Sequence, residues 1–276
     1  MKFSRKAIIG TSILTAALMF AGTSAVYAAD KVPNVVLDGE KYEGDLKLID
    51  GTTYVRLREF SESLGGDVSW ENDERIAGVT ASGLELSAQI GENYISANGR
   101  YLWSPLSVFI ENDRTYVPLR AIGKAFGFNT EWSGEKFEAS LKRERDAIKS
   151  ADTYYSDEDL YWLSRIISAE AGGEPLEGKL AVGAVVLNRV RDSSFPDTVY
   201  GVIFDRNNGT QFTPTSNGAI FARPNAESII AAKLCLEGYL SNEDIMFFIN
   251  TELAESFWIT KNRQFVMSIG AHDFYA

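Results

Sequence analysis

A carboxylate in an unusual place is the first feature of this 276-residue sequence that suggests chemistry. Glu170 ends a run in which apolar residues recur with helical spacing, and it comes just before Gly172-Gly173. At about 100° per residue, Ile166 and Ile167 fall on the same arc of the helix as Glu170. The pattern therefore predicts a helix over residues 157–171 that carries one carboxyl group on its buried face.

Two physical effects would raise the pKa of such a carboxyl group. Burial disfavours its charged form, and the partial negative charge of a helix C-terminus acts in the same direction. A carboxylic acid that keeps its proton near neutral pH is suited to general acid catalysis. The alternative is a structural glutamate, capped by a backbone amide or paired with an arginine, and the pattern alone leaves both interpretations open.

The flanking residues predict where this helix starts and which element comes after it. Ser156, with Asp159 three residues later, approximates a capping box. A second, nearly fully buried helix is predicted from Pro175 to Arg191, kept thin by glycine and alanine. Asn188 and Arg189 lie within its apolar run and need partners, such as backbone carbonyls or aspartates. We interpret both as structural.

Polar and aromatic side chains further along the chain suit sugar binding. Gln211, Phe212 and Thr213 offer an amide, an aromatic ring and a hydroxyl in one loop, although an ordinary capped turn uses the same residue types. His272, the only histidine, lies beside aromatic residues near the end of the chain, where a histidine is more often structural than catalytic. Cys235, the only cysteine, lies in an apolar helical pattern that predicts a buried, inert thiol.

The N-terminus and the overall charge limit the function classes. Residues 1–28 combine basic residues, a short apolar run and Val26-Tyr27-Ala28, which predicts a secretory signal peptide cleaved near Ala28. The alternative is an uncleaved membrane anchor. The net charge of −11 argues against a nucleic-acid partner, and a single cysteine excludes an intramolecular disulfide.

The first half of the chain contains a duplication, in which residues 51–70 and 113–132 align with each other. The matching positions are Tyr54, Val55, Leu57, Arg58, Gly65 and Trp70 in the first copy and Tyr116, Val117, Leu119, Arg120, Gly127 and Trp132 in the second. Each copy is predicted to form a short strand, a helix and further strands, with the glycines as left-handed C-caps. The shared tyrosine, leucine and tryptophan positions are predicted to be core, with ligand stacking as the alternative for the tryptophans.

This duplication resembles the copper amine oxidase N-terminal-like, or stalk, domain over residues 33–143. The oxidase chemistry itself needs several histidine ligands, and this chain has one histidine. The resemblance therefore implies a domain that holds or positions the protein at the cell envelope through a ligand that stays undefined. The charged segment at residues 144–156 is predicted to be a linker.

The second half resembles the SleB/CwlJ family of cell wall hydrolases over residues 157–276. The segments that carry the resemblance are IISAEAGGEPLEGKLAVGAVVLNRV, QFTP, MFFIN and SIGAHDFY. It implies a small, mostly helical, lysozyme-like α+β catalytic domain that acts on peptidoglycan glycan strands without a metal or cofactor. Glu170 occupies the position of the catalytic glutamate. The residues that match the substrate cleft are Gln211, Phe212, Thr213, His272 and Tyr275.

The family implies a lytic transglycosylase, which needs one carboxylate because the sugar's own 6-hydroxyl is the nucleophile. A hydrolytic muramidase would need a second carboxylate. Glu174 and Glu177 are candidates, although solvated or capping roles are expected for both, and Asp205 is another candidate with no supporting pattern. A zinc amidase would need several histidines, and a cysteine peptidase would use a poorly placed Cys235. A non-catalytic wall-binding protein is the remaining alternative. Spore cortex and vegetative wall stay open as substrates, as does the oligomeric state.

Overall fold

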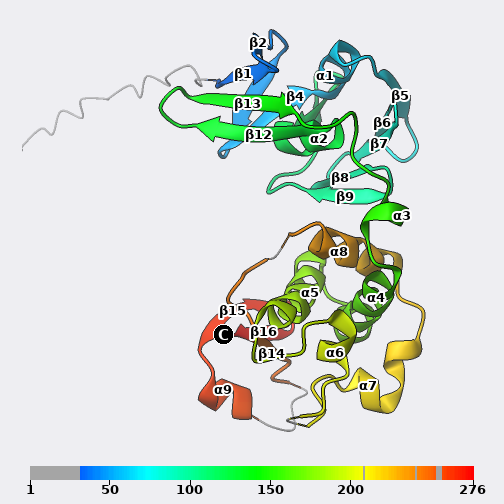
Figure 1. Ribbon diagram of the computed structural model, residues 1–276, viewed down its shortest axis with the longest axis vertical. Coiled ribbons are helices and arrows are strands. Elements are labelled where there is room, and N and C mark those ends of the chain that lie inside the picture. The colour runs from blue at the N-terminus through cyan, green and yellow to red at the C-terminus, as the bar shows by residue number, and fades with distance from the viewer. Residues whose placement is uncertain (1–31, 208, 240, 253–256) are drawn as a thin grey trace, which may run out of the picture. The chain divides into compact units, whose positions relative to one another are not determined.

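A computed structural model describes residues 32–207, 209–239, 241–252 and 257–276. The fold is mixed α+β, with a β-rich N-terminal region, residues 33–143, and a largely helical C-terminal region, residues 157–276 (Figure 1). The predicted signal peptide, residues 1–28, lies outside the described residues. Among the described helices, none is both long and apolar enough to cross a bilayer.

The N-terminal region contains the predicted duplication as two successive copies of the same element order. The copies consist of β3 (Leu46–Ile49), β4 (Thr52–Arg56), α1 (Leu57–Ser63), β5 (Asp67–Glu71) and β6 (Ile76–Ala81), then β10 (Phe109–Glu111), β11 (Arg114–Pro118), α2 (Leu119–Ala125), β12 (Phe128–Ser133) and β13 (Glu138–Arg143). β4 pairs antiparallel with β11, and Val55 lies opposite Val117. Equivalent positions of the two copies thus face each other. Gly65 and Gly127 have φ values of +78° and +83°, which confirms the predicted left-handed conformation.

The other strands of this region extend the sheets around the two copies. They are β1 (Asn34–Leu37), β2 (Glu40–Lys41), β7 (Leu84–Gln89), β8 (Tyr94–Ala97) and β9 (Arg100–Trp103). The strand orders are β12-β13-β1-β2, β10-β11-β4-β3 and β5-β6-β7-β8-β9. Buried residues from all of these sheets and from α1 and α2 share one core.

The shared tyrosines and leucines are core, but the shared tryptophans are not. The buried positions are Tyr54, Tyr116, Leu57 and Leu119. Trp70 and Trp132 are 38% and 47% exposed, so the core prediction was wrong for this pair. Along one face of β12, burial falls from Phe128 to Trp132, because the hairpin runs past the end of the core. The repeat pattern shows which positions share an environment, but not how far the core extends along each strand.

The helices of the C-terminal region follow the predicted pattern closely. They are α4 (Asp157–Ala171), α5 (Leu176–Arg191), α6 (Val199–Ile203), α7 (Pro214–Asn217), the 3₁₀ helix η1 (Ala219–Phe221), α8 (Ala226–Leu236) and α9 (Trp258–Asn262). The bounds of α4 are those predicted from the sequence. Its start is capped by the Ser156 hydroxyl, which accepts a hydrogen bond of 3.3 Å from the backbone N–H of Asp159.

Small residues let α5 approach its neighbours closely. A Cβ atom on Gly183 would lie 2.7 Å from Sγ of Cys235 on α8 and 3.0 Å from Ile167 on α4. Real Cβ atoms do not approach so near, so glycine permits this three-helix contact. The Cys235 thiol is buried in α8, and burial raises its pKa to about 12, which confirms the prediction of an inert thiol.

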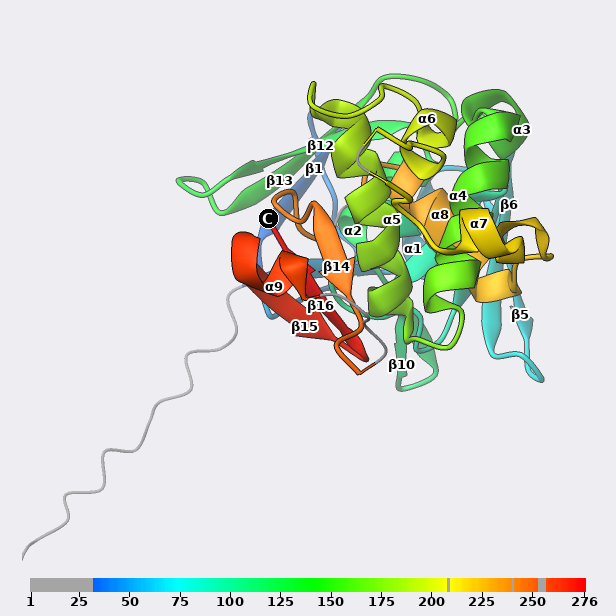
Figure 2. The same ribbon diagram turned by 90° about the horizontal axis from the view of Figure 1, so that it is seen from below.

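A small antiparallel sheet completes the C-terminal region. Its order is β14-β16-β15, formed by β14 (Phe247–Ile249), β15 (Phe265–Ile269) and β16 (His272–Tyr275). Gly270, with φ of +56°, makes the turn between β15 and β16. Figures 1 and 2 show α5 between this sheet and α4, so the two sides of the region meet across one buried helix.

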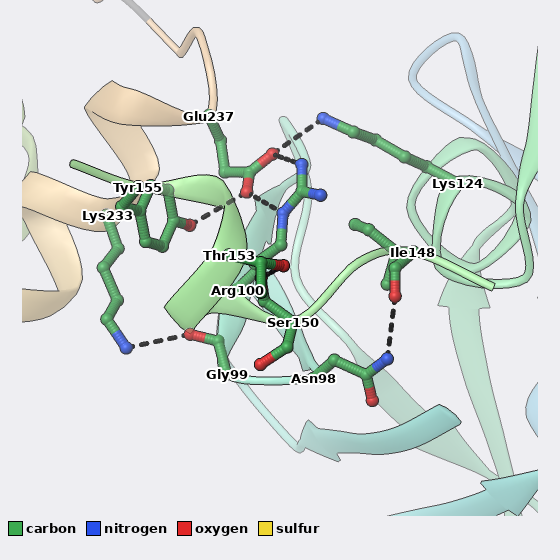
Figure 3. Close-up of polar contacts among 10 residues, drawn as sticks. All are labelled: Asn98, Gly99, Arg100, Lys124, Ile148, Ser150, Thr153, Tyr155, Lys233 and Glu237. Carbon is green, nitrogen blue, oxygen red and sulfur yellow. Dashed lines mark hydrogen bonds and ion pairs between the residues drawn. The ribbon is translucent and has the colours of Figure 1, made fainter. Parts of the chain in front are cut away.

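The segment that connects the two regions is partly ordered as α3 (Ala151–Tyr154) and lies against both. Asn98 in the β8–β9 turn donates through Nδ2 to the Ile148 carbonyl at 2.8 Å, and Lys233 of α8 donates to the Gly99 carbonyl at 2.8 Å. Figure 3 shows these contacts beside a second cluster centred on Glu237. Hydrogen bonds therefore join the N-terminal region, residues 144–156 and α8.

Candidate active site

A groove of about 1520 Å³ lies in the C-terminal region. Its walls include the end of α4, the loop before α7, and strands β14 and β16. The lining residues that bear on chemistry are Glu170, Glu174, Arg189, Gln211, Thr213 and His272. Segments more than 100 residues apart in the sequence thus contribute polar side chains to one hollow.

Glu170 lies in the last turn of α4, as predicted, and is half-buried in the groove wall. Its carboxyl group makes no hydrogen bond or ion pair with any described residue. Burial raises its pKa from an ordinary value of 4.5 to about 7. Without a partner to offset the loss of water, the neutral form is favoured over the charged form. The carboxyl group can therefore hold a proton near neutral pH and still reach the groove.

The predicted sugar-binding loop also lines the groove. Gln211 accepts a hydrogen bond of 3.3 Å from Nη1 of Arg189, and Thr213 is exposed. Phe212 also reaches the lining, but its ring is only 2% exposed and packs 6.2 Å from the ring of Phe248. The loop offers an amide and a hydroxyl to the groove, while the phenyl ring supports the wall from behind.

His272 lies in the same groove next to Glu174, a residue for which the sequence suggested only a solvated or capping role. Nδ1 of His272 is 3.8 Å from Oε1 of Glu174 and makes no hydrogen bond within the described residues. Burial lowers the pKa of His272, against the opposing effect of Glu174 and Asp273. The imidazole is therefore neutral near pH 7. Tyr275, the remaining predicted contact, is buried in β16 and does not line the groove.

The carboxylate of Glu174 is fixed by the turn that carries His272. The backbone N–H of Ala271 donates to Oε2 of Glu174 at 3.1 Å. A Cβ atom on Gly270 would lie 1.7 Å from the same oxygen, so only glycine leaves room for this carboxylate. The chain segment after α4 is thereby joined to the β15–β16 turn. No local pattern in the sequence predicts this contact, because its two sides are 97 residues apart.

Arg189 is a groove residue whose position the sequence suggested only in part. Its predicted need for carbonyl partners is confirmed, since Nε donates to the Met246 carbonyl at 2.7 Å. Burial lowers its pKa to about 10, Asp205 opposes this shift, and Arg263 adds to it. Arg189 also lines the groove, so the groove that contains Glu170 also contains a cation. An arginine inside an otherwise apolar helix was the signal that could have marked it as more than structural.

No three described residues of the His, Cys, Asp and Glu types come together in a way that would hold a metal ion. Among the polar groups that line the groove are a protonatable carboxyl, a fixed carboxylate, a buried guanidinium, an amide, a hydroxyl and a neutral imidazole, and Asp192, Asp205 and Arg263 add further charges. This set can bind a polyhydroxylated ligand and transfer one proton at a defined place.

Comparison with known proteins finds a family match in each half of the chain. Residues 173–275 match the Cell Wall Hydrolase family, and residues 36–141 match the Copper amine oxidase N-terminal domain. The C-terminal region belongs to the cell wall hydrolase family. This confirms both resemblances drawn from the sequence. The matched hydrolase stretch begins just after Glu170 and includes the other predicted site residues.

Several relatives of the chain are spore cortex-lytic enzymes. That of Oceanobacillus iheyensis is 37% identical over 120 residues, which cover 44% of this chain and 42% of the relative. That of Bacillus subtilis is 34% identical over 133 residues, covering 48% and 42%. The catalytic domain of the germination-specific lytic transglycosylase SleB from Bacillus anthracis is 35% identical, with 44% of this chain and 97% of that one covered and a TM-score of 0.40. The chain spans less than half the length of the two curated relatives.

Proposed function

We propose that the chain is an exported enzyme that cleaves the glycan strands of peptidoglycan as a lytic transglycosylase, with Glu170 as acid and base. The observation that carries this proposal is the unpartnered carboxyl group of Glu170 in the groove wall, whose pKa is about 7. Membership of the cell wall hydrolase family supports the substrate class. Export rests on the signal-peptide pattern of residues 1–28 alone.

The reaction needs one group that first gives and then takes a proton. Protonated Glu170 donates to the glycosidic oxygen as the bond from that oxygen to C1 of N-acetylmuramic acid breaks. Positive charge develops on the sugar ring, and the 6-hydroxyl of the same sugar attacks C1. Glu170, now a carboxylate, accepts the hydroxyl proton. The products are a 1,6-anhydro sugar end and a free 4-hydroxyl on N-acetylglucosamine, and no water is consumed.

The other groove residues have supporting roles in this proposal. Gln211 and Thr213 bind sugar hydroxyl or acetamido groups, and neutral His272 offers a nitrogen to the same ligand. Arg189 orients Gln211 through the bond to its amide oxygen. Tyr275 contributes by supporting the sheet that carries His272, because its side chain is buried.

A hydrolytic muramidase is the second candidate, because Glu174 is a second carboxylate in the same groove. A nucleophile or general base must be free to meet the sugar or a water molecule. The carboxylate of Glu174 already accepts the Ala271 N–H and adjoins His272. These contacts favour a positioning role and make hydrolysis the weaker alternative.

Analysis of the products separates these candidates. Purified peptidoglycan is digested with the chain starting after Ala28, and the released fragments are identified by mass spectrometry. We expect 1,6-anhydromuramic ends. Reducing muramic ends would indicate hydrolysis, and binding without any release of fragments would leave a non-catalytic wall-binding protein.

The domain organisation completes the proposal. We assign residues 33–143 to a domain that positions the enzyme at the envelope, residues 144–156 to the connection, and residues 157–276 to catalysis. The copper amine oxidase N-terminal match supports the first assignment only as a domain type. Expression of residues 144–276 alone, compared with residues 29–276 for retention on intact cell walls, tests the positioning role.

A further inference from the structure

Five aromatic side chains lie together on the surface of the C-terminal region, outside the groove. This aromatic patch consists of Tyr161, Trp162, Tyr200, Phe204 and Phe221. Trp162 is at its centre, with ring centroids 4.8 Å from Tyr161, 5.5 Å from Tyr200, 5.0 Å from Phe204 and 6.3 Å from Phe221. The rings come from α4, α6 and η1, so the fold assembles the patch from three separate segments.

The patch faces solvent although aromatic rings usually lie in a core. Tyr161, Tyr200 and Phe221 are 43%, 46% and 63% exposed. Contiguous exposed apolar surface of this kind often marks a binding site. Arg165 stacks its guanidinium 3.6 Å from the centroid of the Tyr161 ring and adds a polar edge. The surface thus offers flat apolar faces with hydrogen-bond donors beside them.

On all three segments the patch lies close in the sequence to residues that line the groove. Asp205 and Ala219 line the groove, and they lie one residue after Phe204 and two residues before Phe221. On α4, Ala169 lines the groove and Trp162 precedes it by two helical turns on the same face, about 10 Å along the axis. The three segments that carry the rings therefore also contribute residues to the groove wall or lie next to it in the sequence.

We propose that the aromatic patch binds the glycan strand beyond the groove and is an extension of the candidate active site. This inference rests on the proposed function. A pyranose ring has an apolar face of C–H groups and polar edges, and aromatic rings bordered by polar groups match both. A polymer that enters the groove must leave it, and the rings lie on or beside the segments that form the groove wall.

The segments that the patch shares with the groove favour a glycan over other occupants. The net charge of −11 opposes docking to an anionic lipid surface. A second copy of the chain would bury the patch, but nothing in its shape ties a self-contact to the groove. The glycan is the occupant that uses the groove and the rings together.

The test measures binding without cleavage, in a Glu170→Gln background. Peptidoglycan strands stripped of stem peptides are titrated against this variant with and without Tyr200→Ala and Phe221→Ala, whose rings are both exposed. We expect the double substitution to raise Kd for long strands about tenfold, from the loss of two ring contacts. Trp132→Ala, an equally exposed ring in the N-terminal region, is the matched control and should leave Kd unchanged.

Three outcomes would overturn the proposal. They are an unchanged Kd in the double variant, an equal loss in Trp132→Ala, and a patch-dependent shift in sedimentation that shows self-association. Binding to phosphatidylglycerol vesicles that depends on Tyr200 and Phe221, with strand binding intact, would assign the patch to lipid instead. Thermal unfolding of each variant confirms that the fold is retained.

Failure of the proposed catalytic function would give a different pattern of results from failure of the aromatic-patch proposal. If the chain with an intact Glu170 released no fragments while the patch variants still lost strand binding, the glycan surface would stand and the catalytic assignment would fall. In an active chain, loss of the patch should raise KM for long strands and leave kcat within about twofold. A fall in kcat alone would place the rings in the catalytic step and contradict a pure binding role.

Discussion

Two carboxyl groups of the C-terminal region are withdrawn from water, yet they are held in opposite states. Glu170 on α4 has no polar partner among the described residues, and burial raises its pKa to about 7. Glu237, just after α8, has a side chain only 3% exposed. Burial also raises the pKa of Glu237, but hydrogen bonds from Arg100 and attraction to Lys124 outweigh it, so the pKa is lowered.

The difference lies in the donors that meet each carboxyl group. Glu237 accepts from Nη2 of Arg100 at 2.8 Å, Nζ of Lys124 at 3.0 Å and the hydroxyl of Tyr155 at 2.8 Å, as Figure 3 shows. Arg100 also stacks 3.4 Å from the ring centroid of Tyr154. Burial alone therefore does not make a proton donor. A buried carboxyl group becomes one only when the fold withholds the cations and N–H groups that would stabilise its charge.

The two buried carboxyl groups also have different roles. At Glu237, donors from the N-terminal region and from residue 155 meet a carboxylate of the C-terminal region, so charge pairing fixes one region against the other. At Glu170 the carboxyl group opens on a groove. We therefore expect substitution of Glu170 to affect mainly activity and substitution of Glu237 to affect mainly stability.

Glu170→Gln should have the largest effect on activity. An amide cannot donate a proton to the glycosidic oxygen, so release of fragments from peptidoglycan should fall about 1,000-fold or more. Initial rates of anhydro-end formation provide the measurement. Glu177→Gln, an exposed carboxylate of the next helix, is the matched control and should retain the rate. Activity retained in Glu170→Gln would remove this residue from the mechanism.

Glu237→Ala should be the most destabilising change at the junction. It leaves Arg100, itself only 3% exposed, without its counter-ion. Removing one partner of a buried ion pair costs about 3 kcal/mol or more in the free energy of unfolding, measured by urea denaturation. In contrast, Lys124→Ala should cost less than about 1 kcal/mol, because its side chain is 46% exposed.

A double substitution tests whether the unpaired charge is the cause of that loss. Arg100→Met combined with Glu237→Leu removes both charges and should recover most of the stability lost in Glu237→Ala. If the double variant is as unstable as the single one, packing around Tyr154 and Tyr155 holds the junction, and the ion pair contributes little.

Glu170→Gln should also stabilise the protein, and only at higher pH. Below pH 4.5 the Glu170 carboxyl is protonated in both folded and unfolded chains and contributes nothing. Between pH 4.5 and about 7 the Glu170 carboxyl ionises in the unfolded chain but not in the folded one, so the free energy of unfolding falls as pH rises. Above about pH 7 the carboxyl is ionised in both states, and this loss of stability stays constant. Glutamine does not titrate. The variant should therefore gain about 2 kcal/mol over the parent at pH 8 and nothing extra at pH 4.

Thermal and urea unfolding of both proteins at the two pH values give this measurement. An equal gain at both pH values would mean that the carboxyl group is ordinarily hydrated in the folded state. The contribution of Glu237 to stability should depend on pH in the opposite direction. Its lowered pKa makes it stabilising above the unfolded value near 4.5, and that contribution is lost as the pH falls further.

The sequence was sufficient where local rules determine the structure. Helical spacing, a serine cap at Ser156 and Gly172-Gly173 predicted α4 to the residue, and with it the position of Glu170. The repeat likewise predicted two strand–helix–strand copies and both left-handed glycines. In each case the backbone conformation and the periodic burial are determined by residues that are close together in the sequence.

Contacts between distant segments were not predictable in the same way. Arg100 and Glu237 are 137 residues apart, and nothing near either residue indicates its partner. The exposure of Trp70 and Trp132 depends on how far each strand extends beyond the hydrophobic core. An alignment of the two repeats does not contain that information. Glu174 was expected to be solvated or capping. Its position in the groove was not predictable, because it is created by the β15–β16 turn, which returns to Glu174 from the end of the chain.

Glu174→Gln should have the smallest effect, and it sharpens the distinction among the three carboxyl groups. Glu174 lies in the groove like Glu170 but has a partner like Glu237, since it accepts the Ala271 N–H at 3.1 Å. A glutamine oxygen can accept the same bond, so the turn should keep its shape. If Glu174 only positions His272, the rate should fall less than about fivefold and the ends should stay 1,6-anhydro. A loss of two orders of magnitude, with reducing ends in the parent reaction, would make Glu174 the second catalytic carboxylate of a hydrolase.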